Sequence, residues 1–183
     1  NKVYEEIIMK SLTALSFSIA ILGGLATYLS LGPLSGVYLI WATFVGWGAF
    51  FALGGTQDAL KNVIVCGIFG VVLAVIAALV ILNVNGAAAL GLPLWAGIVV
   101  AISVFALCMA ANVPALAAIP ASVFGYAPTF AYLLQTPDML STQVMTSASL
   151  ANPIIVISIS IAVGAGFGML SGKLGAVLTK ADV

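Results

Sequence analysis

The chain has 183 residues, of which 63% are hydrophobic and 5% are charged, and it contains no histidine. Soluble domains carry about 25% charged residues, so this chain has too little polar surface to cover a water-facing globule. Acidic and basic residues balance at a net charge of zero, which gives no indication of a nucleic-acid partner.

Six membrane-spanning helices are predicted from the placement of charge. The charged residues leave three long uncharged stretches, between Lys10 and Asp58, between Lys61 and Asp138, and between Asp138 and Lys173. Because a helix needs about 20 residues to cross a bilayer, these stretches have room for two, three and one spans. In chain order we expect spans at residues 11–31, 34–53, 62–82, 94–111, 114–134 and 153–171, and hence one all-α transmembrane domain over residues 1–183.

The connections between these spans are short, apart from residues 135–152. That segment is rich in serine and threonine, so we expect it at the membrane surface, with a short helix of its own. With six spans, all five lysines fall on one side of the membrane, together with both ends of the chain. The positive-inside rule therefore predicts that both ends are cytoplasmic.

The second and fifth spans resemble each other. Gly46 aligns with Gly125 and Phe51 with Phe130, and the Thr-x-Asp-x-Leu sequence of residues 56–60 recurs at 136–140. These matches predict two repeats, over about residues 11–83 and 93–172. Three spans per repeat make the second an inverted copy of the first. A chain dominated by small apolar residues also matches itself by chance, and that alternative stays open.

Both of these spans contain residues that interrupt helices. Pro120 and Pro128 lack the amide proton of a regular helix, and Gly46, Gly48 and Gly125 allow a kink or a close approach. Interrupted helices at equivalent places in two repeats favour a substrate path. The alternative is tight packing between helices. The residues predicted to line the path are Trp41, Thr43, Phe44, Gly46, Trp47 and Phe51 in the second span, and Ser122, Phe124, Gly125, Tyr126, Thr129 and Phe130 in the fifth.

No ionisable residue lies inside any predicted span, which argues against proton coupling and against enzymatic acid–base or metal chemistry. No cofactor is expected. Hydroxyls and aromatic faces suit a small neutral solute such as urea, an amide, ammonia or a small alcohol, so a channel or facilitator is the leading hypothesis. The alternatives are a structural or accessory membrane subunit and an ion-coupled secondary transporter. The expected partners are the lipid bilayer and further copies of the chain in a homo-oligomer.

Two stretches carry a family resemblance. The first runs from Pro33 through Trp41-Ala-x-Phe-x-Gly-Trp and Phe50-Phe-Ala-x-Gly-Gly to Leu60-Lys61, and the second is Ile119-Pro-Ala-x-Val-Phe-Gly-x-x-x-Thr-Phe-Ala131. Both resemble the YcdZ-like bacterial inner-membrane proteins. The resemblance implies a small helical protein of the bacterial inner membrane and no established activity. A looser architectural similarity is to aquaporins and formate–nitrite channels, although the chain lacks their Asn-Pro-Ala pair and central histidine.

Overall fold

The structure is a computed structural model that describes residues 2–180, with side chains placed for residues 11–179. As predicted, the described part of the chain is all-helical. The main helices are α1 (Lys2–Leu31), α2 (Ile40–Ala52), α3 (Gln57–Asn83), α5 (Leu92–Met109), α6 (Ile119–Gln135) and α8 (Pro153–Lys180). The shorter elements are α4 (Gly86–Leu90), α7 (Thr142–Thr146) and the 3₁₀ turns η1 (Ala110–Asn112) and η2 (Pro114–Leu116).

Four of the six predicted spans correspond to segments long and apolar enough to cross a membrane. These segments are Ser11–Leu31, Gln57–Asn83, Leu92–Asn112 and Pro153–Thr179. The spans predicted at 34–53 and 114–134 form helices of only 13 and 17 residues. At 1.5 Å per residue they reach about 20 Å and about 26 Å, less than the hydrocarbon core of about 30 Å. The prediction of six full spans is therefore not confirmed.

Both helices are shorter than predicted because they begin later than the predicted spans. Residues 32–37 form turns before α2, and η1 and η2 stand before α6. The prediction of helices interrupted internally is wrong in this respect, because α2 runs continuously through Gly46 and Gly48. Pro120 occupies the first turn of α6, where no helical hydrogen bond is lost. Of the two prolines in this span, Pro128 is the one that lies in the helix interior.

Side-chain hydrogen bonds hold the segment before α2 against α1 and α8. The Tyr38 hydroxyl donates to the carbonyl of Ala26 at 2.6 Å, and the Ser30 hydroxyl donates to the carbonyl of Tyr38 at 3.1 Å. The amide of Leu39, which precedes α2, donates to Oγ of Ser160 on α8 at 2.9 Å. A backbone group left unpaired at this helix start is thus satisfied by a neighbouring helix.

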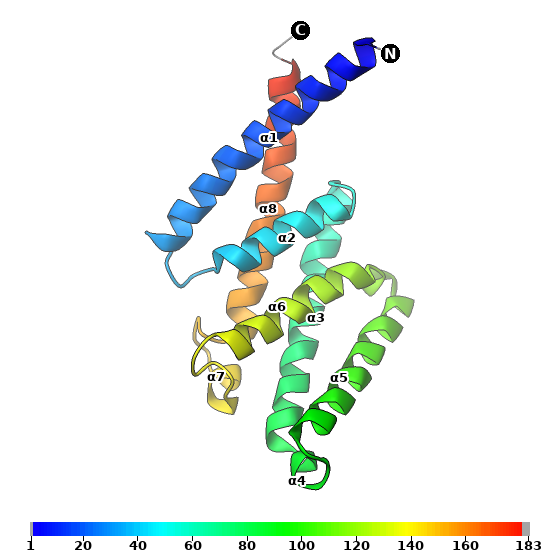
Figure 1. Cartoon of the computed structure of the whole chain (residues 1–183), viewed down its shortest axis with the longest axis vertical. Coiled ribbons are helices and arrows are strands. Elements are labelled where there is room, and N and C mark those ends of the chain that lie inside the picture. The colour runs from blue at the N-terminus through cyan, green and yellow to red at the C-terminus, as the bar shows by residue number, and fades with distance from the viewer. Residues whose placement is uncertain (1, 181–183) are drawn as a thin grey trace.

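The helices form two layers. Figure 1 shows α1, α2, α6 and α5 running diagonally and roughly parallel, with α2 crossing in front of α8 and α6 crossing in front of α3. The helix α1 also packs on α8, α5 packs on α3, and α3 packs against α8. The two ends of the chain lie at the same end of the molecule (Figure 1). The short helices therefore occupy the centre of one layer, directly over the two long central helices.

The hydrophobic core fills the space between these layers. Its largest fully buried members include Phe50, Val71, Ile157 and Ile161, from α2, α3 and α8. Phe124 of α6 is half-buried and packs against the same cluster. The centre of the molecule is consequently apolar and close-packed.

The Thr-x-Asp-x-Leu matches proved to lie in different local structures. Thr56 caps α3 by accepting a hydrogen bond from the amide of Ala59 at 3.1 Å. Thr136 instead follows the end of α6, and α8 begins only at Pro153. The residue that caps α8 is Asn152, whose Oδ1 accepts from the amide of Ile154 at 2.9 Å. This part of the predicted repeat is wrong because residues 137–152 intervene between the second short helix and the following long one.

Residues 137–152 form an ordered loop, and its helix α7 confirms the predicted short helix. The Asn152 side chain donates to the carbonyls of Met145 and Ser147 at 3.1 and 2.7 Å. The Tyr132 hydroxyl donates to the carbonyl of Ala151 at 3.0 Å, which ties the loop to α6.

Candidate functional site

The candidate site consists of the two crossings at which the short helices meet the long ones. Where α2 crosses α8, a Cβ added to Gly46 would overlap the carbonyl oxygen of Ile161 and stand 2.8 Å from its Cα. A Cβ added to Gly164 would overlap the carbonyl of Thr43 and stand 2.9 Å from the amide nitrogen of Trp47. The two backbones are therefore in direct contact, and only glycine fits on each side.

The crossing of α6 and α3 has the same construction. A Cβ added to Gly125 would overlap the carbonyl oxygen of Gly67, and one added to Gly70 would overlap the carbonyl of Ser122 and stand 3.0 Å from the amide nitrogen of Tyr126. The alignment of Gly46 with Gly125 also places Thr43 opposite Ser122 and Trp47 opposite Tyr126, so corresponding residues of the two short helices stand at the two crossings.

Burial follows the same alignment along both short helices. The 13 residues of α2 (40–52) and residues 119–131 of α6 have the same sequence of buried, half-buried and exposed positions throughout. Ala42 and Ala121 are both 0% exposed, whereas Phe44 and Val123 are 44% and 42% exposed. The two helices therefore present corresponding faces to their respective partners.

Three predicted hydroxyl residues are buried at these crossings. Thr43 donates to the carbonyl of Leu39 at 3.0 Å, and Thr129 donates to the carbonyl of Gly125 at 2.9 Å. Ser122 is 1% exposed, and its Oγ has no hydrogen-bond partner among the described residues. Two of the three hydroxyls are thus satisfied within their own helix, while that of Ser122 remains available for a partner.

Trp47 is the centre of an aromatic stack. Its ring lies 5.7 Å from that of Phe44 and 5.6 Å from that of Phe167, with interplanar angles of 10° and 20°. Its Nε1 donates to Oγ of Ser171 at 3.1 Å, and Ser18 of α1 donates to the carbonyl of Ser171 at 2.7 Å. This network joins α1, α2 and α8 inside the apolar interior.

Tyr126 occupies the corresponding place on α6. Its hydroxyl is 2.7 Å from Oγ of Ser103 on α5, and its ring lies 5.1 Å from that of Phe130. Serine hydroxyls between apolar helices hold them together in a membrane, where no water competes for the hydrogen bond.

The predicted path residues differ in their burial. Gly46, Gly125, Thr43, Ser122, Trp47, Tyr126 and Thr129 are buried at the two crossings, and Phe51, Phe124 and Phe130 are half-buried. Trp41 and Phe44 are 41% and 44% exposed on the outer face of α2. The prediction omitted the partners on the other helices, namely Ser18, Gly67, Gly70, Ser103 and Ser171. Each of them is a glycine or serine within an otherwise apolar helix, and this pattern in the sequence could have identified them.

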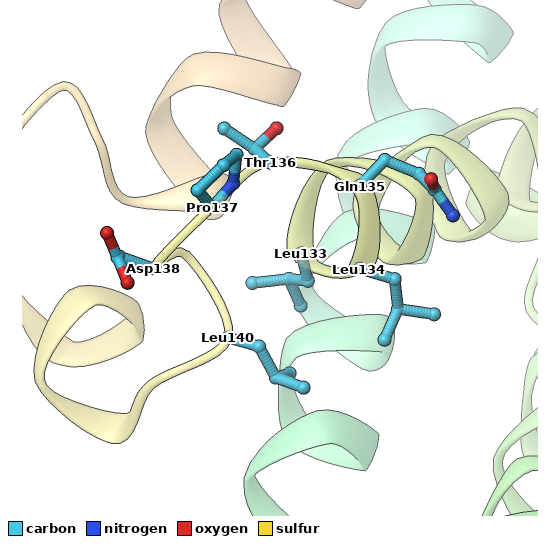
Figure 2. Close-up of a pocket in the computed structure, with 7 residues that line it drawn as sticks. All are labelled: Leu133, Leu134, Gln135, Thr136, Pro137, Asp138 and Leu140. Carbon is cyan, nitrogen blue, oxygen red and sulfur yellow. The ribbon is translucent and has the colours of Figure 1, made fainter.

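Four pockets of 220–360 Å³ lie along the helices, and none of these four is lined by residues of both α2 and α6. The largest of these four, of 360 Å³, lies where α6 ends and includes Gln135, Thr136 and Asp138. Figure 2 shows the Asp138 carboxylate and the Gln135 amide on opposite sides of this pocket, pointing apart. They do not converge on one ligand. Within the described residues, no group of three histidine, cysteine or acidic side chains is placed to hold a metal ion.

Comparison with known proteins assigns the family. The family of proteins of unknown function DUF1097 matches residues 16–176, which takes in all of α2, α3, α5 and α6, the second half of α1 and most of α8. The chain belongs to the DUF1097 family. No curated protein and no solved structure matches it. Family membership therefore carries no activity to this chain.

Proposed function

We propose that this DUF1097 protein is an inverted-repeat membrane facilitator for a small uncharged solute. The observation that carries the proposal is the correspondence between the two crossings. The aligned residues Thr43 and Ser122 meet Gly164 of α8 and Gly70 of α3 in the same way, and the burial of the two short helices agrees position by position. Inverted repeats with short central helices are a recurring architecture of membrane transport proteins.

The distribution of charge supports an uncharged solute. Between residues 11 and 179 the charged side chains are Asp58, Lys61, Asp138 and Lys173, and all four are exposed. Neither crossing has a charge that could replace the hydration shell of an ion. The groups at the crossings are hydroxyls and aromatic rings, which suit urea, small amides, ammonia or small alcohols.

In this proposal the conformation described here is a closed one. Phe124 extends from α6 into the central cluster that contains Phe50, Val71 and Ile161. Phe124 corresponds to the smaller Val45 on α2, and we assign Phe124 the role of an apolar gate. Conduction then requires that α6 move away from this cluster.

A flux measurement on proteoliposomes tests the proposal. The protein is reconstituted, and urea, acetamide, ammonia and glycerol are compared with empty vesicles. Phe124→Ala should raise the flux of the conducted solute several-fold, whereas Val123→Ala, which changes the neighbouring exposed residue, should leave it unchanged. Flux equal to that of empty vesicles for wild type and Phe124→Ala alike would exclude a facilitator of these solutes.

A second candidate function is a structural or accessory membrane subunit. The sealed backbone contacts at Gly46 and Gly125 favour it, because they leave no opening at either crossing. This candidate predicts no flux and co-purification with a membrane complex. A secondary transporter coupled to an ion through backbone carbonyls is the third alternative.

Location and assembly complete the proposal. The lysine distribution and the resemblance to YcdZ-like proteins support the bacterial inner membrane with both ends of the chain cytoplasmic. A homo-oligomer is proposed because two layers of helices make a thin protomer for a sealed pore. The aquaporin and formate-channel analogy adds only an example of such assemblies.

A further inference from the structure

Cys66 of α3 and Ser160 of α8 occupy corresponding places beside the two crossings. Gly70 of α3 and Gly164 of α8 each lie against the carbonyl of an aligned residue of a short helix, and Cys66 and Ser160 each precede that glycine by four residues. Both side chains are 0% exposed. Each makes a hydrogen bond with the chain just before a short helix, so the two residues hold corresponding connections.

The segment before α2, residues 34–39, is held by several strong hydrogen bonds. The amide of Leu39 donates to Oγ of Ser160 at 2.9 Å. The Tyr38 side chain is 3% exposed, and its hydroxyl donates to a carbonyl of α1 at 2.6 Å. The backbone carbonyl of Tyr38 accepts from the Ser30 hydroxyl at 3.1 Å. This segment is therefore tied to both α1 and α8.

The segment before α6, residues 113–118, has one weak connection in the corresponding place. The thiol of Cys66 donates to the carbonyl of Ala115 across 3.5 Å, and a thiol is a weak donor. Within the described part of the chain, no other hydrogen bond joins this segment to a long helix. Ala117, which aligns with the buried Tyr38, is exposed and has no polar side-chain group that could anchor it. The start of α6 is therefore held less firmly than the start of α2.

The remaining attachments of α6 lie further along the helix. Its close contact with α3 runs from Ser122 to Tyr126. The Tyr126 hydroxyl is 2.7 Å from a serine Oγ of α5, and the Tyr132 hydroxyl donates to the loop after α6 at 3.0 Å. These contacts hold the later part of α6 in place when the chain ahead of Ser122 lifts. Local opening of this kind occurs where backbone is exposed and contacts are few.

We propose that the contact between Cys66 and Ala115 is a weak latch at which the segment before α6 opens, whereas the corresponding contact of Ser160 keeps the segment before α2 closed. Opening lifts residues 113–118 away from α3 and uncovers the Cys66 thiol. Two halves with similar crossings thereby differ in mobility, and motion begins at the start of α6. Its role as the first step of the α6 movement in conduction rests on the proposed function, but the latch itself does not.

Thiol reactivity in lipid nanodiscs tests the latch. Cys108→Ala leaves Cys66 as the single thiol, and a second protein with Cys66→Ser, Cys108→Ala and Ser160→Cys has its single thiol at the corresponding place on α8. N-ethylmaleimide, which enters the bilayer, is added, and intact-mass spectrometry follows the labelled fraction with time. We expect Cys66 to react about tenfold faster than the thiol introduced by Ser160→Cys, a factor that corresponds to one ordinary hydrogen bond. In dodecyl sulfate both denatured proteins should react at the same rate, which gives the intrinsic reactivity.

Tyr38→Phe, added to the Ser160→Cys protein, is the converse variant. It keeps the ring but removes the hydrogen bond to α1, so it should raise the reaction rate of the introduced thiol several-fold. The proposal would be overturned by equal rates for the two thiols, by faster reaction on α8, by an unreactive Cys66, or by an unchanged rate in Tyr38→Phe. No solute takes part in this experiment, so an absence of flux in proteoliposomes would reject the facilitator and leave the latch unaffected.

Discussion

Gly46 lies directly against the backbone of Ile161, with the carbonyl oxygen of Ile161 where a Cβ of residue 46 would be. Gly46→Ala should therefore force α2 away from α8 and destabilise the protein by about 1–3 kcal/mol. Thermal unfolding in detergent, followed by fluorescence-detected size exclusion, measures the effect.

Gly48→Ala is the matched control for this substitution. Gly48 is two residues further along α2, is exposed, and has no atom within 4 Å of the position of an added Cβ. It should unfold at nearly the temperature of the wild type. Equal losses for the two variants would mean that the contact with Ile161 is not what stabilises this crossing.

Ser171 supplies the acceptor for the buried indole of Trp47. Ser171→Ala should cost about 1–3 kcal/mol, because Nε1 is then left unpaired in the apolar interior. The double variant Ser171→Ala with Trp47→Phe removes both partners and should lose less than the sum of the two single variants. The quantity to measure is the coupling free energy from unfolding curves. A coupling of zero would contradict the role assigned to this hydrogen bond.

The backbone of Asp138 is in the left-handed region, with φ of 63°. Glycine adopts this conformation without steric cost, so Asp138→Gly should preserve stability or raise it by up to about 1 kcal/mol. Asp138→Val should lower it, because a β-branched residue is strongly disfavoured at positive φ. Comparison of the two unfolding midpoints decides the matter. The same midpoint for both variants would mean that the loop changes its conformation at this position.

The orientation can be tested by labelling introduced cysteines in a Cys66→Ala, Cys108→Ala background. Lys61 and Asp138 are both exposed, near the start of α3 and in the loop after α6. With Lys61 cytoplasmic, an impermeant maleimide added to intact cells should label Asp138→Cys and not Lys61→Cys. Permeabilised cells provide the control, since both should react there. Labelling of both in intact, sealed cells would contradict the proposed topology.

The sequence predicted the long helices well because hydropathy and charge determine them almost alone. The span predicted at 11–31 ends at Leu31, as α1 does, and α8 begins at the predicted Pro153. The prediction failed for the starts of α2 and α6. Residues 34–39 are mostly apolar, but the turn at Gly36, with φ of 81°, and the hydrogen bonds of Tyr38 hold them outside the helix. Such tertiary contacts cannot be predicted from hydropathy or charge.

The candidate site was predicted in part. Gly46 and Gly125 were identified from their alignment, but a glycine beside a path and a glycine beneath another helix have the same sequence pattern. Their partners Ile161 and Gly67 come from α8 and α3, and only the folded chain brings them together. The match between residues 56–60 and 136–140 was misleading because the two similar sequences adopt different structures. Thr56 caps α3, whereas Thr136 follows the end of α6.

The uncharged character of α2 and α6 has a consequence for energetics in the cell. Moving one elementary charge across a membrane potential of 100 mV requires about 2.3 kcal/mol. These two helices carry no charge, and an uncharged solute brings none. In the proposed mechanism, a shift of α2 and α6 carries no side-chain charge through the electric field of the bilayer, so we expect solute flux to depend little on the membrane voltage.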